Sequence, residues 1–175
     1  MHRFSTRDLT LAAMVAALYA VMSYFGNIFG LTFGPVQLRF AEALTVLPFL
    51  FPATVPGLFV GCVMTNLISP FGLLDVAAGS LATLLAALWT SRVKSRWLAP
   101  LPPVICNAVL VGFTLSWTQA GGFTAALPAA WFYNGLTVGL GELGACCVLG
   151  MLLLHLIPKI KIFRTMIPKG RMMSI

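Results

Sequence analysis

Residues 132–157 read FYNGLTVGLGELGACCVLGMLLLHLI, an apolar run with a single acidic side chain, Glu142. A helix needs about 20 mostly apolar residues to cross the roughly 30 Å hydrocarbon core of a membrane, and this run exceeds that length. Of the 175 residues, 59% are hydrophobic and 9% are charged, whereas about a quarter of a soluble domain is charged. The sequence therefore predicts an integral membrane protein.

Five further apolar runs precede this one, separated by prolines, glycines and short charged segments. We expect an all-α membrane protein, a bundle of six transmembrane helices that forms one integral membrane domain over residues 1–175. The predicted spans lie near 8–27, 38–52, 54–70, 74–91, 101–119 and 132–157, followed by a basic tail at 158–175. The second and third runs are short and closely joined, so five spans is the alternative count.

Basic residues indicate the orientation, because loops rich in Lys and Arg stay in the cytoplasm. All lysines and arginines except Arg39 fall before the first predicted span, after the fourth or after the sixth. With six spans these groups share one side, which predicts cytoplasmic termini in a cell-membrane protein. The net charge is +7, but a nucleic-acid binder spreads its bases over a solvated face. We therefore expect the lipid bilayer, and no nucleic acid, as a partner.

Four charged residues lie inside or at the outer ends of the predicted spans: Arg39, Glu42, Asp75 and Glu142. A charge at the centre of a span costs roughly 2.5–3.5 kcal/mol, so such residues usually face the bundle interior and have a partner. Three acids and one base from different spans are thus predicted to meet in a polar pocket towards the outer side. The simpler alternative for Arg39 and Glu42 is a local ion pair at i, i+3.

Amides and tryptophans on the same side are further candidates for this pocket. The full set of predicted substrate-binding residues is Gln37, Arg39, Glu42, Asn66, Asp75, Asn107, Asn134, Glu142, Trp117 and Trp131. The alternative for each amide is a hydrogen bond between helices, and for the two tryptophans it is anchoring at the membrane interface. An acid-rich pocket suits a ligand with N–H donors or a positive charge, because carboxylates form strong charge-assisted hydrogen bonds.

The sequence offers little for catalysis or metal binding. Its serines and threonines lack a neighbouring His or Lys to activate a nucleophile, its four cysteines lack the spacing of zinc ligands, and it has no G-x-x-x-x-G-K-[ST] phosphate loop. We predict a protein that is not an enzyme and holds no cofactor or metal. The alternatives are an intramembrane enzyme that uses Glu42, Asp75 or Glu142, and a carrier driven by an ion gradient.

Ala12, Ala16 and Ala20 repeat every four residues in the first predicted span. Small residues at this spacing form a smooth face that another helix can approach closely. The residue pattern leaves two interpretations open, namely packing inside the bundle and a docking surface for a second membrane subunit.

Residues 34–48 read GPVQLRFAEALTVLP, and further motifs follow in order: Pro56-Gly57, GLLD at 72–75, PPVI at 102–105 and GEL at 141–143. This ordered set, which covers about residues 10 to 155, resembles the QueT family. Members of that family are substrate-binding (S) components of energy-coupling factor (ECF) transporters and are assigned to queuosine precursors.

The resemblance implies a six-helix S component that captures a 7-deazaguanine, such as prequeuosine or queuine, on the outer side. It also implies a transmembrane T component and two cytoplasmic ATPase subunits as partners. The alanine face of the first span, with Ala12, Ala16 and Ala20, would contact the T component, and the S component would reorient in the membrane and deliver its ligand inward as ATP is used. Glu42 and Glu142 would be the main recognition groups, with Asp75 third and Arg39 orienting the ligand. The loop at 26–37 would act as a lid. The nearest alternative is an S component for another vitamin.

Overall fold

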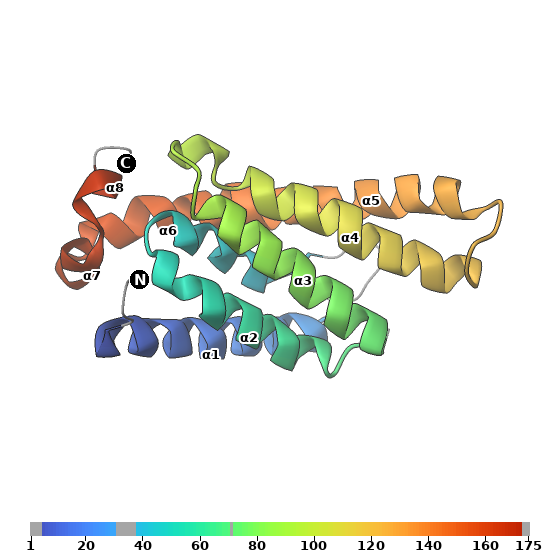
Figure 1. Ribbon diagram of the computed structural model, residues 1–175, viewed down its shortest axis with the longest axis horizontal. Helices are drawn as coiled ribbons and strands as arrows, with labels where there is room; N and C mark the ends of the chain where they lie inside the picture. The colour runs from blue at the N-terminus through green and yellow to red at the C-terminus, as the bar shows by residue number, and fades with distance from the viewer. Residues whose placement is uncertain (1–4, 31–37, 71, 173–175) are drawn as a thin grey trace.

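The computed structural model describes residues 5–30, 38–70 and 72–172, and these residues form helices and the turns between them (Figure 1). In chain order the α-helices are α1 (Thr6–Ile28), α2 (Val55–Asn66), α3 (Leu73–Thr90), α4 (Leu101–Ala120), α5 (Leu127–Leu143), α6 (Met151–Leu156), α7 (Lys161–Met166) and α8 (Lys169–Met172). The 3₁₀-helices are η1 (Phe40–Phe49), η2 (Pro52–Thr54), η3 (Arg96–Leu98) and η5 (Ile157–Lys159), and η4 (Gly144–Gly150) is a π-helix. The fold is all-α.

Among the described residues, four helical segments are long and apolar enough to cross a membrane: Thr6–Ile28, Leu73–Thr90, Arg96–Ala120 and Leu127–Lys159. The predicted second and third spans are shorter. The second is the ten-residue 3₁₀-helix η1, which rises only about 20 Å at about 2.0 Å per residue. The third, α2, ends at Asn66 after twelve residues.

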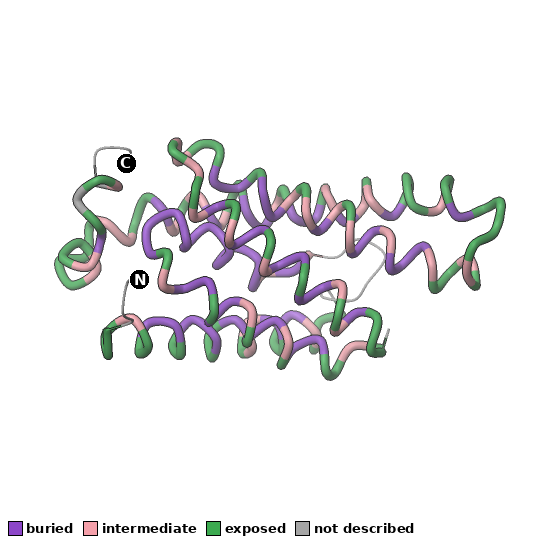
Figure 2. The backbone as a smooth tube through the Cα atoms, in the orientation of Figure 1, coloured by how far each residue is buried: buried purple, intermediate pink, exposed green. Residues whose placement is uncertain are grey.

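Helix η1 lies in the middle of the bundle, where it contacts α1, α3, η4 and α6. Every residue from Ala41 to Phe49 is buried, and the buried residues, purple in Figure 2, gather in the interior of the bundle. The hydroxyl of Thr45 donates to the carbonyl of Glu42 at 2.5 Å, and Pro48 inside the helix has no N–H to donate. Protein therefore surrounds this short helix on all sides.

Helices α1 and α2 pack closely through small residues. A Cβ at Gly57 would overlap the carbonyl oxygen of Ala12, and a Cβ at Gly61 would lie 2.8 Å from the carbonyl oxygen of Ala16. Ala12 and Ala16 are 5% and 9% exposed, and Ala20 is half-buried. This corrects the docking interpretation for Ala12 and Ala16, because their face of α1 is covered by α2 of the same chain.

The two ends of the molecule differ (Figure 1). The α4–α5 hairpin extends beyond the other helices at one end, while the start of α1 and the helices α7 and α8 lie at the other. There Ile167 is buried in the main core, the Phe163 and Phe51 rings lie 6.3 Å apart, and Arg171 donates to the carbonyl oxygens of Ser91 and Val93. The segment 161–172 is therefore packed against the body of the bundle.

Candidate functional site

Six of the predicted residues form a group of polar side chains at the centre of the bundle, which we name the central polar cluster. Its members come from five elements and the residue that precedes η1: Arg39, Glu42 (η1), Asn66 (α2), Asp75 (α3), Asn107 (α4) and Glu142 (α5). All are buried, and the most exposed of them is Arg39 at 3%. Segments far apart in the sequence thus place one base, two amides and three acids in the protein interior.

One side of the cluster links Arg39 to α3 through Asn66. Nη2 of Arg39 donates to Oδ1 of Asn66 at 2.9 Å, and Nδ2 of Asn66 donates to the main-chain oxygen of Asp75 at 3.2 Å. A Cβ at Gly79 would lie 2.7 Å from this Nδ2, so a glycine there leaves room for the amide. The alternative of an Arg39–Glu42 ion pair is wrong, because in the described chain Arg39 donates to Asn66 and no ion pair joins it to Glu42.

Glu42 is held on one side only. Its Oε1 accepts hydrogen bonds from the hydroxyl of Tyr19 at 2.5 Å and from that of Thr83 at 3.3 Å. These partners lie on α1 and α3, so they fix the orientation of the carboxylate from two helices. Its other oxygen, Oε2, is buried and has no hydrogen-bond partner in the described part of the chain.

Glu142 is connected to Glu42 through a thiol. Sγ of Cys146 lies 3.6 Å from Oε2 of Glu142 and 3.4 Å from the main-chain oxygen of Glu42. Cys146 belongs to the π-helix η4, which interrupts the α-helical geometry immediately after α5, and π-helical turns occur frequently at functional sites. The amide of Asn107 on α4 lies near Glu142, but neither of its two polar atoms makes a hydrogen bond of acceptable geometry with a described residue.

The cluster leaves six buried polar atoms without a hydrogen-bond partner among the described residues: Nη1 of Arg39, Oε2 of Glu42, Oδ2 of Asp75, Nδ2 and Oδ1 of Asn107 and Oε1 of Glu142. A buried polar atom without a partner costs about 1–3 kcal/mol, and folded proteins contain a few per 100 residues; among the described residues of this chain all of them lie in this one cluster. Four of the six atoms are oxygens that can accept and two are nitrogens that can donate. The cluster is therefore suited to a polar ligand that donates more hydrogen bonds than it accepts.

Three predicted site residues lie apart from the cluster. Nδ2 of Asn134 donates to Oγ of Ser116 and Oε1 of Gln119 at 3.0 and 2.8 Å. Because Asn134 is eight residues from Glu142 on α5, it lies about 12 Å along the helix from the cluster.

Nε1 of Trp131 donates to the carbonyl of Val109 at 3.0 Å, and the Trp117 ring packs edge-on against that of Phe123 at 4.4 Å. Trp117 is ten residues from Asn107 on α4, which is about 15 Å. The prediction that these residues join the acids is corrected, because each is engaged within the α4–α5 hairpin. Gln37 lies outside the described residues.

Sequence reasoning missed the neighbours that hold the acids in place. Tyr19, Thr83 and Cys146 each contact a carboxylate of the cluster. The signal was helical spacing, since Tyr19 follows Ala16 by three residues and Cys146 follows Glu142 by four, which places each on the same helix face. A polar side chain on a helix face that already carries small or acidic residues could therefore have indicated that Tyr19 and Cys146 lie next to the acids.

Comparison with known proteins gives two matches. The sequence matches the QueT transporter family over residues 9–159. It is also 32% identical over 84 residues to the queuosine precursor transporter QueT of Lactococcus lactis subsp. cremoris (strain MG1363), a match that spans 48% of this chain and 49% of the relative, about half the length of each. No solved structure matches the chain. Since the family match covers most of the sequence, this multi-pass membrane protein belongs to the QueT transporter family, whose members are transporters and not enzymes.

Proposed function

We propose that this chain is the substrate-binding S component of an ATP-driven importer of the ECF type, and that it captures a queuosine precursor at the outer side of the cell membrane. Two findings support the substrate class: the chain belongs to the QueT transporter family, and its relative in Lactococcus lactis is named a queuosine precursor transporter. The binding site is the central polar cluster.

The observation that carries this proposal is the set of six unpaired buried atoms in the cluster. A 7-deazaguanine carries N1–H and an exocyclic amine on one edge, and one carboxylate can accept from both in charge-assisted hydrogen bonds. Oε2 of Glu42 or Oε1 of Glu142 supplies such an acceptor. A cationic aminomethyl arm suits a second acid, for which Asp75 is available, and Nη1 of Arg39 can donate to the ring carbonyl.

We further propose that the chain crosses the membrane six times, with both termini in the cytoplasm. The start of α1 and the helices α7 and α8 lie at the same end of the molecule (Figure 1), as an even number of crossings requires. Short helices such as η1 and α2 are compatible with membrane depth where protein covers them, and η1 is buried along its length. In this arrangement the α4–α5 turn faces outwards.

The energy for transport would come from other chains, because the sequence contains no phosphate-binding loop of the G-x-x-x-x-G-K-[ST] type. We propose a transmembrane T component and two cytoplasmic ATPase subunits as partners. With Ala12 and Ala16 buried against α2, contact of α1 with the T component would use the neighbouring exposed face, which carries Ala13 and Ala17. Both are small residues that permit close helix approach.

The test is thermal stabilisation of the purified, detergent-solubilised chain by a panel of ligands: 7-aminomethyl-7-deazaguanine, 7-cyano-7-deazaguanine, queuine, guanine, riboflavin, thiamine and biotin. A ligand at a hundredfold excess over its Kd stabilises a protein by about 2.7 kcal/mol. We expect selective stabilisation by a deazaguanine. Stabilisation by a vitamin alone would assign another substrate, and uptake by the chain alone in liposomes without ATPase subunits would contradict the ECF mechanism.

A further inference from the structure

A groove of about 850 Å³ lies between the first turns of α1 and helix α7, and no residue of the central polar cluster lines it. Its α1 wall includes Arg7, Leu11 and Met14, and its α7 wall includes Lys161, Phe163 and Met166. These two walls are separated by about 150 residues of sequence and meet at the end of the molecule where the tail packs (Figure 1).

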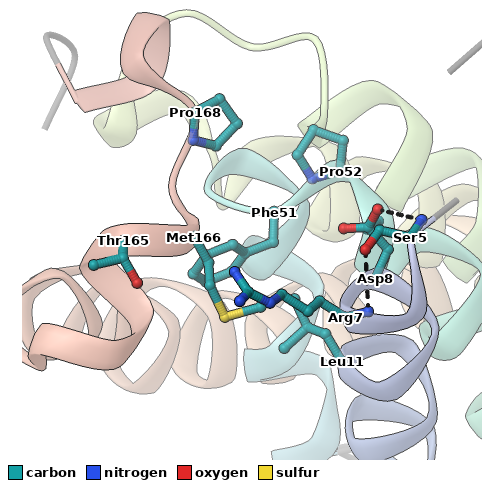
Figure 3. A pocket seen from close by; sticks show the side chains of 10 residues that line it. Ser5, Arg7, Asp8, Leu11, Phe51, Pro52, Thr165, Met166 and Pro168 are labelled. Atoms are coloured by element: carbon teal, nitrogen blue, oxygen red, sulfur yellow. Dashed lines mark hydrogen bonds between the residues drawn. The ribbon is translucent and has the colours of Figure 1, made fainter. Parts of the chain in front are cut away.

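A second cavity of about 610 Å³ adjoins this groove, because Arg7, Leu11 and Met166 line both. Figure 3 shows the side chain of Arg7 reaching from α1 towards Met166, with Phe51 beside it. The acid of this cavity, Asp8, accepts a hydrogen bond from the main-chain N–H of Ser5 at 3.0 Å as part of the helix cap. Arg7 therefore lines both the cavity and the groove, and the nearby Asp8 carboxylate is already hydrogen-bonded to the main chain of Ser5.

The groove is lined by both basic and apolar side chains. Arg7 and Lys161 are exposed, one on each wall, and neither side chain has an ion-pair or hydrogen-bond partner among the residues described. Met14 lies seven residues further along α1 than Arg7, about 10 Å deeper into the bundle. Each wall of the groove thus carries one exposed cation, and the remaining lining is five apolar side chains (Leu11, Met14, Ile162, Phe163 and Met166) and three threonines.

We propose that this groove is a binding site for an anionic phospholipid. The phosphate would lie between Arg7 and Lys161, and an acyl chain would run past Leu11 and Met14. The inference goes beyond the proposed transport function and rests on it in one respect, the cytoplasmic location of the tail. On that side the anionic headgroups of the membrane surface attract basic residues. A short basic helix with an apolar face is typical of segments that lie in this interface, and the bound lipid would hold α7 against α1.

The test compares lipid binding to the full-length chain in detergent by native mass spectrometry, with phosphatidylglycerol and phosphatidylcholine of equal chain length. The test variant is Arg7→Gln/Lys161→Gln. The matched control is Arg92→Gln/Lys94→Gln, which removes two exposed bases outside the groove. A basic side chain near an anionic headgroup contributes on the order of a fivefold change in affinity.

We expect the wild type and the control to bind phosphatidylglycerol more tightly than phosphatidylcholine, and the test variant to bind phosphatidylglycerol about 25-fold more weakly than the wild type. The single variant Lys161→Gln, on the exposed tail, should also bind phosphatidylglycerol more weakly, but by a smaller factor. It serves as a second test in case the double variant does not fold. Equal loss in test and control variants would overturn the site, because general surface charge would then explain binding. Binding of glycerol phosphate as tight as that of the lipid would reassign the groove to a free phosphate.

Discussion

In the α4–α5 hairpin the amide of Asn134 donates to both Ser116 and Gln119, whereas Asn107, on the same helix pair, leaves both atoms of its amide unpaired within the described chain. The two regions use the same residue type at comparable burial, since Asn134 is 4% and Asn107 0% exposed. They differ in whether the protein itself supplies the hydrogen-bond partners.

This difference separates a structural polar network from a binding site. A buried amide whose donors and acceptors are matched inside the protein stabilises helix packing. Buried carboxylates held on one oxygen and unpaired on the other, as in Glu42, are oriented by the fold but incomplete without another molecule. On this basis we propose that the central polar cluster recognises the ligand and that the hairpin network maintains the shape of α4 and α5.

The largest effect is expected from neutralising the acids of the cluster. Glu42→Gln and Glu142→Gln keep the side-chain shape but replace a charged acceptor, and a hydrogen bond to a charged group contributes about 1.5–3 kcal/mol. Each variant should bind 7-aminomethyl-7-deazaguanine about 10- to 100-fold more weakly in isothermal titration calorimetry. Wild-type affinity in both folded variants would remove the cluster as the binding site.

A second, smaller effect should come from Gly79→Ala. The new Cβ would meet Nδ2 of Asn66 at 2.7 Å and displace the amide that accepts from Arg39, so we expect about fivefold weaker ligand binding through loss of one oriented hydrogen bond.

The matched control is Gly139→Ala on α5, where the new Cβ would lie 3.5 Å from the Cβ of Ala108, an ordinary contact distance. It should retain wild-type affinity in the same titration. Equal losses in the two variants would show that helix crowding in general, and not the position of Asn66, weakens binding.

Asn134→Ala tests the hairpin network, the region proposed to have a structural role only. It removes two hydrogen bonds between α4 and α5, and such bonds in membrane proteins contribute about 0.6 kcal/mol on average. The variant should show a lower melting temperature with unchanged ligand affinity. A loss of ligand affinity without a lower melting temperature would place the hairpin in the binding site, and the hairpin network and the central polar cluster would then not differ in role.

Among the variants expected to lose ligand affinity, Tyr19→Phe should lose the least. The hydroxyl contacts Oε1 of Glu42, which is not the unpaired oxygen, and Thr83 continues to hold that atom. Ligand affinity should fall about twofold, since the carboxylate keeps one of its two anchors. Thr118→Val, which removes a bond within α4 only, should change nothing, and a tenfold loss in Tyr19→Phe would mean that the phenol itself contacts the ligand.

The sequence predicted which charged residues meet, because an ionisable group in an apolar helix has to face protein. Arg39, Glu42, Asp75 and Glu142 are indeed brought together, although their role in binding remains a prediction. The partners of each atom could not be predicted. Helix rotation and depth decide whether Arg39 meets Glu42 or Asn66, and these follow from packing contacts between distant segments.

The same limit explains the other differences. Small residues every four positions predict a close helix contact, but the pattern does not tell which helix makes it; for Ala12 and Ala16 it is α2. Apolar length predicts spans, but it does not distinguish an α-helix from the 3₁₀-helix η1. Tryptophans near span ends were ambiguous between anchoring and binding, and Trp131 makes its hydrogen bond within the α4–α5 hairpin.

The most direct test of the central claim is to locate the ligand. A photoreactive 7-deazaguanine derivative would be bound to the purified chain, cross-linked by light and mapped by mass spectrometry, with unlabelled ligand as competitor. The account predicts competed cross-links in η1 (Phe40–Phe49) and in the parts of α3 and α5 around Asp75 and Glu142. Competed cross-links confined to the hairpin around Trp117 and Trp131 would contradict it.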